Sequence, residues 1–372
     1  MTAPKKEYDA IIIGTRIAGA ILGSLLGEQG HKVLAIDRAE FPSDTLSTHF
    51  FRAPAFRAFD AIGVMDEVGQ QAPKLRVNYN VIDGIIFPEP VDRPEDYPFF
   101  MNIRRITLDA ILHRRLATAQ GVEAVQDAVA TGLIWDGKQL VGVKWKDDSG
   151  KHESRARVIV GADGARSFLA RKVKAEFEHR DEITRTMYYA YFSGIEPNEG
   201  PAAEFHYNGN EIGYLMPCDA NLSLLAISAP IDEFEHFKKD PAGHLMARLN
   251  EMSAMKTRLS AGKMESKVMG TGSIFTYKRV PYGPGWALVG DAGMAFDPWS
   301  GQGIDQSSSH AKILAGHLNQ FFADELTWEA AMRDFHQKRN AFSKKAYRQT
   351  STFSSDLRPM TQAALKKRGL AH

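Results

Sequence analysis

The sequence predicts an α/β fold with two interleaved parts: a Rossmann-like domain that carries a β-meander, and an α+β domain built on an antiparallel sheet. Three observations favour this fold. The stretch from Tyr8 to Arg38 is an apolar strand, a glycine turn, an apolar helix and a second strand. The stretch from Glu178 to Met269 contains mostly strand-like segments. Apolar strands that lead into glycine and aspartate recur at Arg157–Gly161 and Trp286–Asp291, so we expect the chain to return to its first domain.

The opening unit has the pattern of a nucleotide-binding βαβ motif. Ala10–Ile13 is a continuous apolar run that stops at Gly14, and apolar residues recur at helical spacing from Ile17. The second strand, Lys32–Ile36, leads to Asp37, about 20 residues beyond the glycine turn. An acid there is placed to accept hydrogen bonds from a ribose, while the helix start offers free N–H groups to a pyrophosphate.

Arg16 interrupts this motif. In Gly14-Thr15-Arg16-Ile17-Ala18-Gly19 it stands where the dinucleotide fingerprint has a glycine that lets the backbone approach the phosphates. One interpretation is an ordinary βαβ crossover that binds no nucleotide. The other is a guanidinium that pairs with the pyrophosphate through charge-assisted hydrogen bonds.

Length and composition narrow the class of protein. The chain has 372 residues, which favours two domains, and its 46 Lys and Arg balance 45 Asp and Glu. This balance gives no support for nucleic acid as a partner, so we expect a small-molecule ligand. A single cysteine, Cys218, indicates a reducing compartment, and no apolar run is long enough for a membrane span. With no signal-like segment at the start, the sequence predicts a cytoplasmic protein, and it assigns no oligomeric state.

The remaining elements follow in order. A loop rich in turn formers over 38–49 precedes a short helix from Pro54 to Gly63, whose aromatic residues we interpret as packing. A helix then runs to Gln120, followed by the meander with Asp147–Gly150 as a turn. Strands are predicted at Leu75–Val81, Gly84–Phe87, Val122–Val129, Leu140–Lys146, His152–Ala156, Arg185–Phe192, Ala202–His206, Gly213–Met216 and Leu222–Ala229.

The later helices and the domain limits complete this prediction. Helices are expected at Pro241–Ser253, from Gly303 onward and at Trp328–Tyr347, and the basic tail from Gln349 is expected to be partly disordered. The predicted first domain comprises residues 1–74, 99–177 and 270–325. The predicted second domain comprises residues 75–98 and 178–269, and residues 326–372 form a C-terminal helix and basic tail.

Three motifs in this order resemble the single-component FAD monooxygenases of the para-hydroxybenzoate hydroxylase fold, over nearly the whole chain. They are the βαβ unit, the Asp-Gly motif Gly161-Ala162-Asp163-Gly164-Ala165-Arg166-Ser167, and Gly290-Asp291 with Pro298-Trp299-Ser300-Gly301-Gln302-Gly303. Departures from the family are Arg16 and Asp297. The chain lacks the Trp-x-Trp-x-Ile-Pro pattern of the related flavin halogenases, and Gly213-Tyr214-Leu215-Met216-Pro217 keeps only the outline of the prenyl reductase pattern.

The resemblance implies a set of FAD-binding residues and no metal site. Asp37 and Arg38 would hold the adenosine, Asp291 the pyrophosphate and ribityl region, and a helix starting near Gly303 would stabilise negative charge on the reduced flavin. The alternative for Arg52 and Arg105 is a surface charge at a helix start. The implied cofactor residues are Gly14, Arg16, Ile17, Ala18, Gly19, Asp37, Arg38, Arg52, Arg105, Asp163, Asp291, Pro298, Gly301, Gln302, Gly303 and Ile304.

The resemblance also implies the reaction. NAD(P)H would reduce bound FAD, dioxygen would add to the reduced flavin, and the resulting hydroperoxide would transfer one oxygen to a small aromatic or other organic substrate. The candidate catalytic residues are Tyr189, Tyr191, His206 and Tyr214, each of which could instead be a buried, satisfied side chain. Two alternative functions remain open: an FAD-dependent reductase of carbon–carbon double bonds, and a ligand carrier that has lost FAD.

Overall fold

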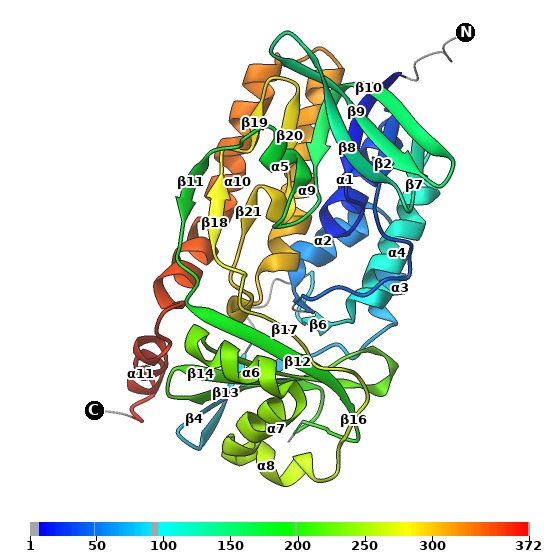
Figure 1. The fold of residues 1–372 in the computed structure, drawn as a ribbon. Coiled ribbons are helices and arrows are strands. Elements are labelled where there is room, and N and C mark those ends of the chain that lie inside the picture. The colour runs from blue at the N-terminus through cyan, green and yellow to red at the C-terminus, as the bar shows by residue number, and fades with distance from the viewer. Residues whose placement is uncertain (1–6, 48, 91–95, 198, 371–372) are drawn as a thin grey trace.

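Two eight-stranded sheets organise the chain, one above the other in the view of Figure 1. The computed structural model describes residues 7–47, 49–90, 96–197 and 199–370. The polar residues that precede the first strand and the last two residues of the predicted tail therefore lie outside the described part. The mixed α/β class predicted from the sequence is confirmed.

The first sheet has a parallel centre in the order β20-β10-β1-β2-β7. The apolar run in β1 is buried on both faces, because alternate residues pack against helices on one side and against the meander on the other. The bounds are β1 (Glu7–Ile13), β2 (Val33–Ile36), β7 (Val122–Val125), β8 (Val129–Asp136), β9 (Gln139–Asp147), β10 (Gly150–Gly161), β19 (Tyr282–Gly283) and β20 (Trp286–Leu288).

Helices cover one face of this sheet, and α5 (Phe168–Lys172) packs with the meander on the other. The aromatic residues of α2, Phe56 and Phe59, are fully buried, which confirms that they serve packing. The covering helices are α1 (Ile17–Glu28), α2 (Ala53–Ala61), α3 (Met65–Gly69), α4 (Arg105–Ala117), α9 (Gly303–Phe322) and α10 (Trp328–Phe353).

The meander differs from the prediction in two ways. The predicted strands His152–Ala156 and Arg157–Gly161 form one strand, β10, which pairs antiparallel with β9 in its first half and parallel with β1. The predicted strand Val122–Val129 ends early at Val125, because Asp127 has a positive φ of 49° that breaks the extended backbone. Its first part, β7, belongs to the parallel centre instead.

The second sheet has the order β16-β12-β15-β14-β13-β4-β5, with β17 beside β12. All pairs are antiparallel except β13 with β4. The bounds are β4 (Val77–Ile82), β5 (Ile85–Pro90), β12 (Arg185–Ser193), β13 (Ala202–Asn208), β14 (Glu211–Pro217), β15 (Ser223–Pro230), β16 (Lys263–Met264) and β17 (Met269–Thr271). These strands, apart from the last two residues of β17, come from the segments assigned to the second domain; the domain limits remain a prediction.

One face of the second sheet is covered by α6 (Phe234–Lys239), α7 (Pro241–Glu251) and α8 (Ser253–Leu259), of which only α7 was predicted. The other face looks toward the first sheet and α9 (Figure 1). Smaller elements complete the fold: the pair β3 (Phe50–Phe51) and β6 (Met101–Asn102), and the sheet of β11 (Phe177–Arg180), β18 (Tyr277–Arg279) and β21 (Met294–Ala295).

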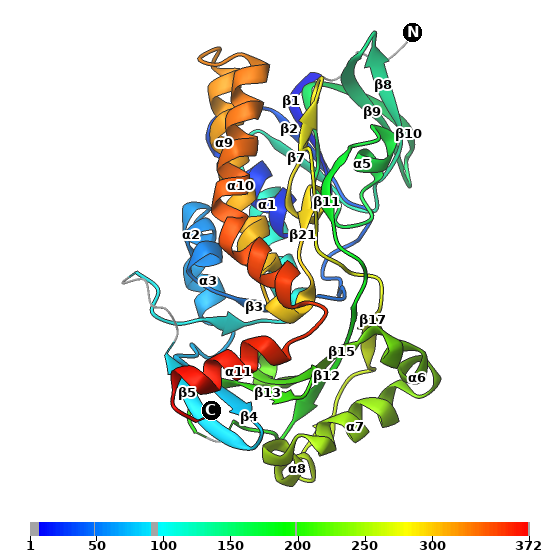
Figure 2. The same cartoon turned by 90° about the vertical axis from the view of Figure 1, so that its left-hand side faces the viewer.

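The expectation of a partly disordered tail from Gln349 is wrong. The helix α10 continues to Phe353, and α11 (Arg358–Lys367) follows it and lies across β4 and β5 in Figure 2. Leu357 is fully buried and Leu365 is 6% exposed, so apolar contacts fix this segment despite its basic composition. In the described chain, we find no helix long and apolar enough to cross a bilayer.

Candidate functional site

The turn between β1 and α1 is as narrow as the sequence predicts. Gly14 has a φ of +97°, and a Cβ built on it would lie 2.6 Å from the carbonyl oxygen of Ala162, so only glycine fits. The α1 helix starts after Arg16, whose side chain makes no capping hydrogen bond. No N-cap side chain accepts hydrogen bonds from the N–H groups of the first turn, so these groups are available to an anion.

Asp37 lies beside this turn at the end of β2. Its carboxylate accepts hydrogen bonds from the backbone N–H groups of Thr15 at 2.6 Å and Ala39 at 2.9 Å. These contacts hold the acid against the start of α1, where a ribose next to the pyrophosphate would reach it. Arg38 is exposed. The adenosine role of both residues stays a prediction.

Arg16 turns toward protein groups. Its guanidinium donates to the hydroxyl of Ser43 at 2.8 Å and forms an ion pair with Asp109, a fully buried acid on α4. Asp109 also binds Arg105 at 2.9 Å, so two arginines share one carboxylate. Arg105 is only 8% exposed, which contradicts the alternative that it is a surface charge at a helix start. The site holds one net positive charge here, placed where an anionic cofactor would pass.

Two further acids lie near these groups: Asp163 is beside the Gly14 turn, and Asp291 is close enough to Arg105 for its charge to act on it. Asp163 accepts the N–H of Phe168 at 2.6 Å through Oδ2, while its Oδ1 is buried without a partner among the described residues. Burial raises the pKa of Asp163. Burial also raises the pKa of Asp291 to about 6, against an opposing effect of the nearby Arg105 guanidinium. The Oδ1 atom of Asp163 is thus short of a hydrogen-bond partner, which a bound polar group would supply.

The start of α9 forms a second helix terminus without a side-chain cap. Gly301 has a φ of +61°, Gln302 makes no capping hydrogen bond, and a Cβ on Gly303 would meet no atom within 4 Å. The space over this terminus is open. Arg52 fixes the terminus, since its Nε donates to Asp305 at 2.8 Å and its Nη2 donates to the Gly301 carbonyl at 3.2 Å.

Asp297 shapes the approach to this terminus. Its carboxylate caps the turn through the N–H of Trp299 at 3.1 Å, which accounts for this departure from the family pattern. Burial raises the pKa of Asp297 to about 6. Pro298 follows at the first position of the turn, and Ile304 in the first turn of α9 is buried.

These observations fit the binding of FAD. Two helix starts have no side-chain caps, the Gly14 turn is closed tightly, and Asp163 has an orphaned buried oxygen. A pyrophosphate suits the α1 start, and the electron-rich side of an isoalloxazine ring suits the α9 start. The part each predicted cofactor residue takes in binding remains a prediction. Among the described residues, no group of three or more His, Cys, Asp or Glu side chains could hold a metal ion.

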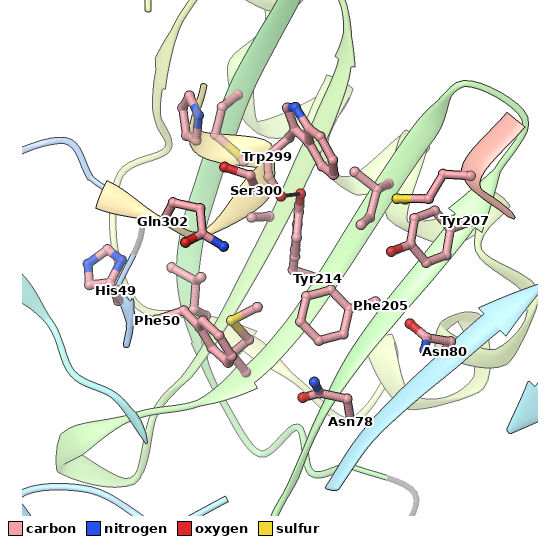
Figure 3. Close-up of a pocket in the computed structure, with 18 of the residues that line it drawn as sticks. His49, Phe50, Asn78, Asn80, Phe205, Tyr207, Tyr214, Trp299, Ser300 and Gln302 are labelled. Carbon is pink, nitrogen blue, oxygen red and sulfur yellow. Dashed lines mark hydrogen bonds between the residues drawn. The ribbon is translucent and has the colours of Figure 1, made fainter. Parts of the chain in front are cut away.

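A cavity of about 510 Å³ adjoins the α9 terminus (Figure 3). Its floor is the second sheet, where alternate residues of β12, β13, β14, β15 and β4 face the same side. Strand register sets Asn80, Phe205 and Tyr214 in one row across three strands. The other walls come from the segment 47–52, from the loop 298–302 and from Met360, Thr361 and Ala364 around α11.

Two of the four predicted catalytic residues line this cavity, and a third contacts one of its lining residues. Tyr214 and Tyr189 line it, and the hydroxyl of Tyr214 donates to the Trp299 carbonyl oxygen at 2.9 Å. The hydroxyl of Tyr191 lies 2.6 Å from Nε2 of His49, which also lines the cavity. Burial raises the pKa of all three phenols and lowers that of His49 to about 3, so these groups are uncharged near neutral pH.

His206 does not face the flavin side, contrary to its prediction as a catalytic candidate. It alternates with Phe205 and Tyr207 along β13, and these two neighbours point into the cavity while His206 points to the opposite face. There its Nε2 lies 2.8 Å from Glu204, which binds Arg258 on α8 at 2.6 Å. This ion-pair network packs the α8 side of the sheet, so His206 is corrected to a structural residue.

Sequence reasoning missed several residues at the site. Asn78 and Asn80 on β4 line the cavity, and their period of two was the available signal that they share a face. Leu357, Thr361 and Leu365 recur at helical spacing and mark the buried side of the C-terminal segment. Asp109 carried no signal beyond being an acid in an apolar helix.

Comparisons with known proteins agree with this geometry. The profile of a family described as "FAD binding domain" matches residues 7–350. A curated relative, the 1H-pyrrole-2-carbonyl-(peptidyl-carrier protein) brominase of Pseudoalteromonas luteoviolacea, is 26% identical over 85% of this chain and 78% of the brominase. The digeranylgeranylglycerophospholipid reductase of Methanocella arvoryzae is 25% identical over 91% of this chain and 85% of the reductase.

Two solved structures share the fold. The myxobacterial chondrochloren halogenase CndH has a TM-score of 0.85 and 20% identity, over 93% of this chain and 82% of the halogenase. PqsL, a probable FAD-dependent monooxygenase from Pseudomonas aeruginosa, has a TM-score of 0.82 and 20% identity, over 94% of this chain and 96% of PqsL. At these identities the structures show the fold alone.

Proposed function

The chain belongs to the FAD binding domain family and is an FAD-dependent oxidoreductase, and from this premise we propose that it is an NAD(P)H-dependent monooxygenase. Its substrate would be a small, largely apolar organic molecule that receives one atom of dioxygen. Bound FAD would supply the redox chemistry that activates dioxygen. The residues of this chain bind, orient and shield the substrate.

The observation that carries this proposal is the cavity beside the α9 terminus. Phe50, Trp299 and Met216 lie at its inner end, are at most 6% exposed, and keep bulk water from the region where a substrate would meet the flavin. Exclusion of water protects a reactive oxygen donor from unproductive decay. The cavity is therefore suited to oxygen transfer to an apolar ring.

The uncharged groups around the inner end have definite parts in this proposal. The hydroxyl of Tyr214 is used in its hydrogen bond to the Trp299 carbonyl oxygen, so Tyr214 orients the 298–302 loop. Tyr189 lines the cavity and its hydroxyl has no hydrogen-bond partner of normal geometry among the described residues, so it is a candidate donor to a substrate oxygen. His49 is neutral, lines the cavity and is held by Tyr191, so it is a candidate hydrogen-bond partner for the substrate.

A second candidate is reduction of a carbon–carbon double bond. One observation favours it: the segment Gly213–Pro217, which resembles the prenyl reductase pattern in outline, is β14 and supplies Tyr214 and Met216 to the cavity floor. The similarity to the archaeal reductase points the same way. The similarity to the brominase supports halogenation, but the chain lacks the Trp-x-Trp-x-Ile-Pro pattern of flavin halogenases.

The test compares three reactions of the purified flavoprotein on one panel of uncharged aromatic and prenyl compounds. With NADH or NADPH in air enriched in ¹⁸O₂, we expect products that gain one labelled oxygen. The same mixture without oxygen should give none, and added bromide or chloride should leave the product unchanged. Saturated products formed without oxygen would replace the proposal with reduction, and halide-containing products would replace it with halogenation.

A further inference from the structure

The outer end of the cavity differs in chemistry from its inner end. Asn78 and Asn80, both on β4, lie on the opposite side of the cavity from His49 and Gln302 (Figure 3). Tyr207 lies near this polar end, and the aromatic side chains of Phe205 and Tyr214 line the cavity between the two ends (Figure 3). The cavity therefore has an apolar middle and a polar outer end, which suits an elongated molecule with one polar head.

The outer end lacks a hydrogen-bond donor for one of its own acceptors. The Oδ1 atom of Asn78 is buried and has no partner among the described residues. Asn80 uses its amide N–H to bind Glu89 at 2.6 Å. A buried carbonyl oxygen without a partner loses the hydrogen bonds that it had in water, so a bound molecule that brings an N–H or O–H to this point would be favoured.

The charges at the cavity disfavour an anionic head. Glu89 stands at the outer end, and the nearest cation to it, Arg368, lies 3.8 Å away and stacks on Phe87 at 4.2 Å. Arg52 lines the inner end, where Asp305 neutralises it. Among the residues that line the cavity in the described chain, no cation lacks an acidic partner. A carboxylate here would face Glu89 and the Asn78 oxygen without a counter-charge.

We infer that the substrate is an uncharged, elongated molecule with an apolar ring toward Trp299 and a hydrogen-bond donor, such as a primary amide, at Asn78. The inference rests on the proposed function for its direction, since it places the ring at the flavin end. A primary amide can form two hydrogen bonds with Asn78. Its N–H donates to the unpartnered Oδ1 atom, and its carbonyl oxygen accepts from the Asn78 side-chain N–H.

Binding to the FAD-loaded protein tests the inference without turnover. Calorimetric titration would compare three probes of one shape: 2-naphthamide, 2-naphthoate and 2-naphthylmethylammonium. We expect the amide to bind about tenfold more tightly than the carboxylate, which is the size of one buried hydrogen bond. Equal or tighter binding of the carboxylate would overturn the inference, and so would the absence of binding by all three probes.

Two variants locate the preference. Asn78→Leu should reduce the advantage of the amide to within a few-fold, while Asn208→Leu, at an exposed site on β13 outside the cavity, should leave it unchanged. Asn78→Asp keeps the shape, adds a negative charge and should shift the preference to the ammonium probe. An amide advantage that survives Asn78→Leu would refute the assignment. Because no reaction is measured, failure here is distinct from failure of the oxygen-dependence test.

Discussion

Arg16 and Asp109 form an ion pair in which the carboxylate is fully buried and the guanidinium is 24% exposed. The pair joins the start of α1 to α4, and through Ser43 it also holds the loop that follows Asp37. Arg16 thus replaces the glycine of the dinucleotide fingerprint without turning its side chain across the helix start. The fingerprint therefore lacks its glycine at a position where the arginine side chain binds Asp109 and Ser43.

Arg16→Gly should weaken FAD binding. The change removes charge-assisted hydrogen bonds to Ser43 and Asp109, worth about 1.5–3 kcal/mol, and frees the loop beside the cofactor region. Titration of FAD into the apo forms measures the effect. Comparison at low and high salt separates two causes, because loss of a direct pyrophosphate contact would also reduce the salt dependence.

Arg16→Lys is the matched control for this prediction. It keeps the positive charge beside Asp109 but cannot make the forked contacts, so we expect intermediate affinity. Tighter FAD binding in Arg16→Gly would show that the arginine side chain obstructs the cofactor. It would contradict the view that the contacts of Arg16 with Ser43 and Asp109 support FAD binding.

Asp291→Ala should lower the FAD content of purified protein far more than Asp60→Ala. Asp291 carries a pKa raised to about 6 by burial and lies beside the cofactor region, whereas Asp60 is an exposed residue of α2. Flavin absorbance per protein is the measurement. Equal retention in the two variants would remove Asp291 from the cofactor site, and wild-type protein that stays colourless after refolding with FAD would favour the carrier hypothesis.

Tyr214→Phe and Tyr189→Phe should differ in stability. The first removes a hydrogen bond to the Trp299 carbonyl and should lower the free energy of unfolding by about 1 kcal/mol. The second removes a hydroxyl that has no normal partner among the described residues, so stability should hardly change. Urea denaturation of both variants checks this. A larger loss in Tyr189→Phe would contradict the assignment of its hydroxyl to the substrate.

His310 should make the protein less stable in acid. Burial lowers its pKa from an ordinary value of 6.5 to about 3, with Arg339 adding to the effect. Below pH 6.5 the His310 imidazole therefore binds a proton in the unfolded chain but stays neutral in the folded chain. The free energy of unfolding falls as the pH falls toward 3. Between pH 8 and pH 5 this loss is about 2 kcal/mol.

His310→Gln should remove that part of the pH dependence, although the variant is less stable overall. Urea denaturation at pH 8 and pH 5 gives the difference for each protein. His236→Gln, at an exposed position on α6, is the control and should keep the wild-type slope. An unchanged slope in His310→Gln would show that the imidazole titrates normally in the folded protein.

Removal of residues 359–372 should weaken binding of 2-naphthamide about tenfold while FAD content stays the same. The deletion removes Met360, Thr361 and Ala364 from the cavity wall and keeps Leu357 in the core. Calorimetry and flavin absorbance measure the two quantities. A Lys366→Ala, Lys367→Ala double variant, changed only at exposed positions of α11, should bind normally. Loss of FAD in the truncated protein would assign the segment to the cofactor domain instead.

The sequence predicted the parts of the fold that local pattern controls. The β1–α1–β2 unit, the aromatic packing of α2 and the longer strands of the second sheet follow from apolar periodicity, whereas the short strands β16 and β17 were not predicted. The prediction of a partly disordered tail was wrong. It rested on basic residues such as Lys366 and Lys367 and overlooked the helical spacing of the buried Leu357, Thr361 and Leu365. The facing direction of His206 depended on strand register, which a single sequence leaves open by one residue.

The cavity draws its walls from the segments 47–52, 78–89, 187–226, 298–302 and 349–364. A ribosome therefore releases the predicted cofactor residues, which end at Ile304, before the outer wall of the cavity has left it. A nascent chain could hold its cofactor while the reaction chamber is still open to water. A chain that lacks α11 would then carry its cofactor behind an unfinished wall.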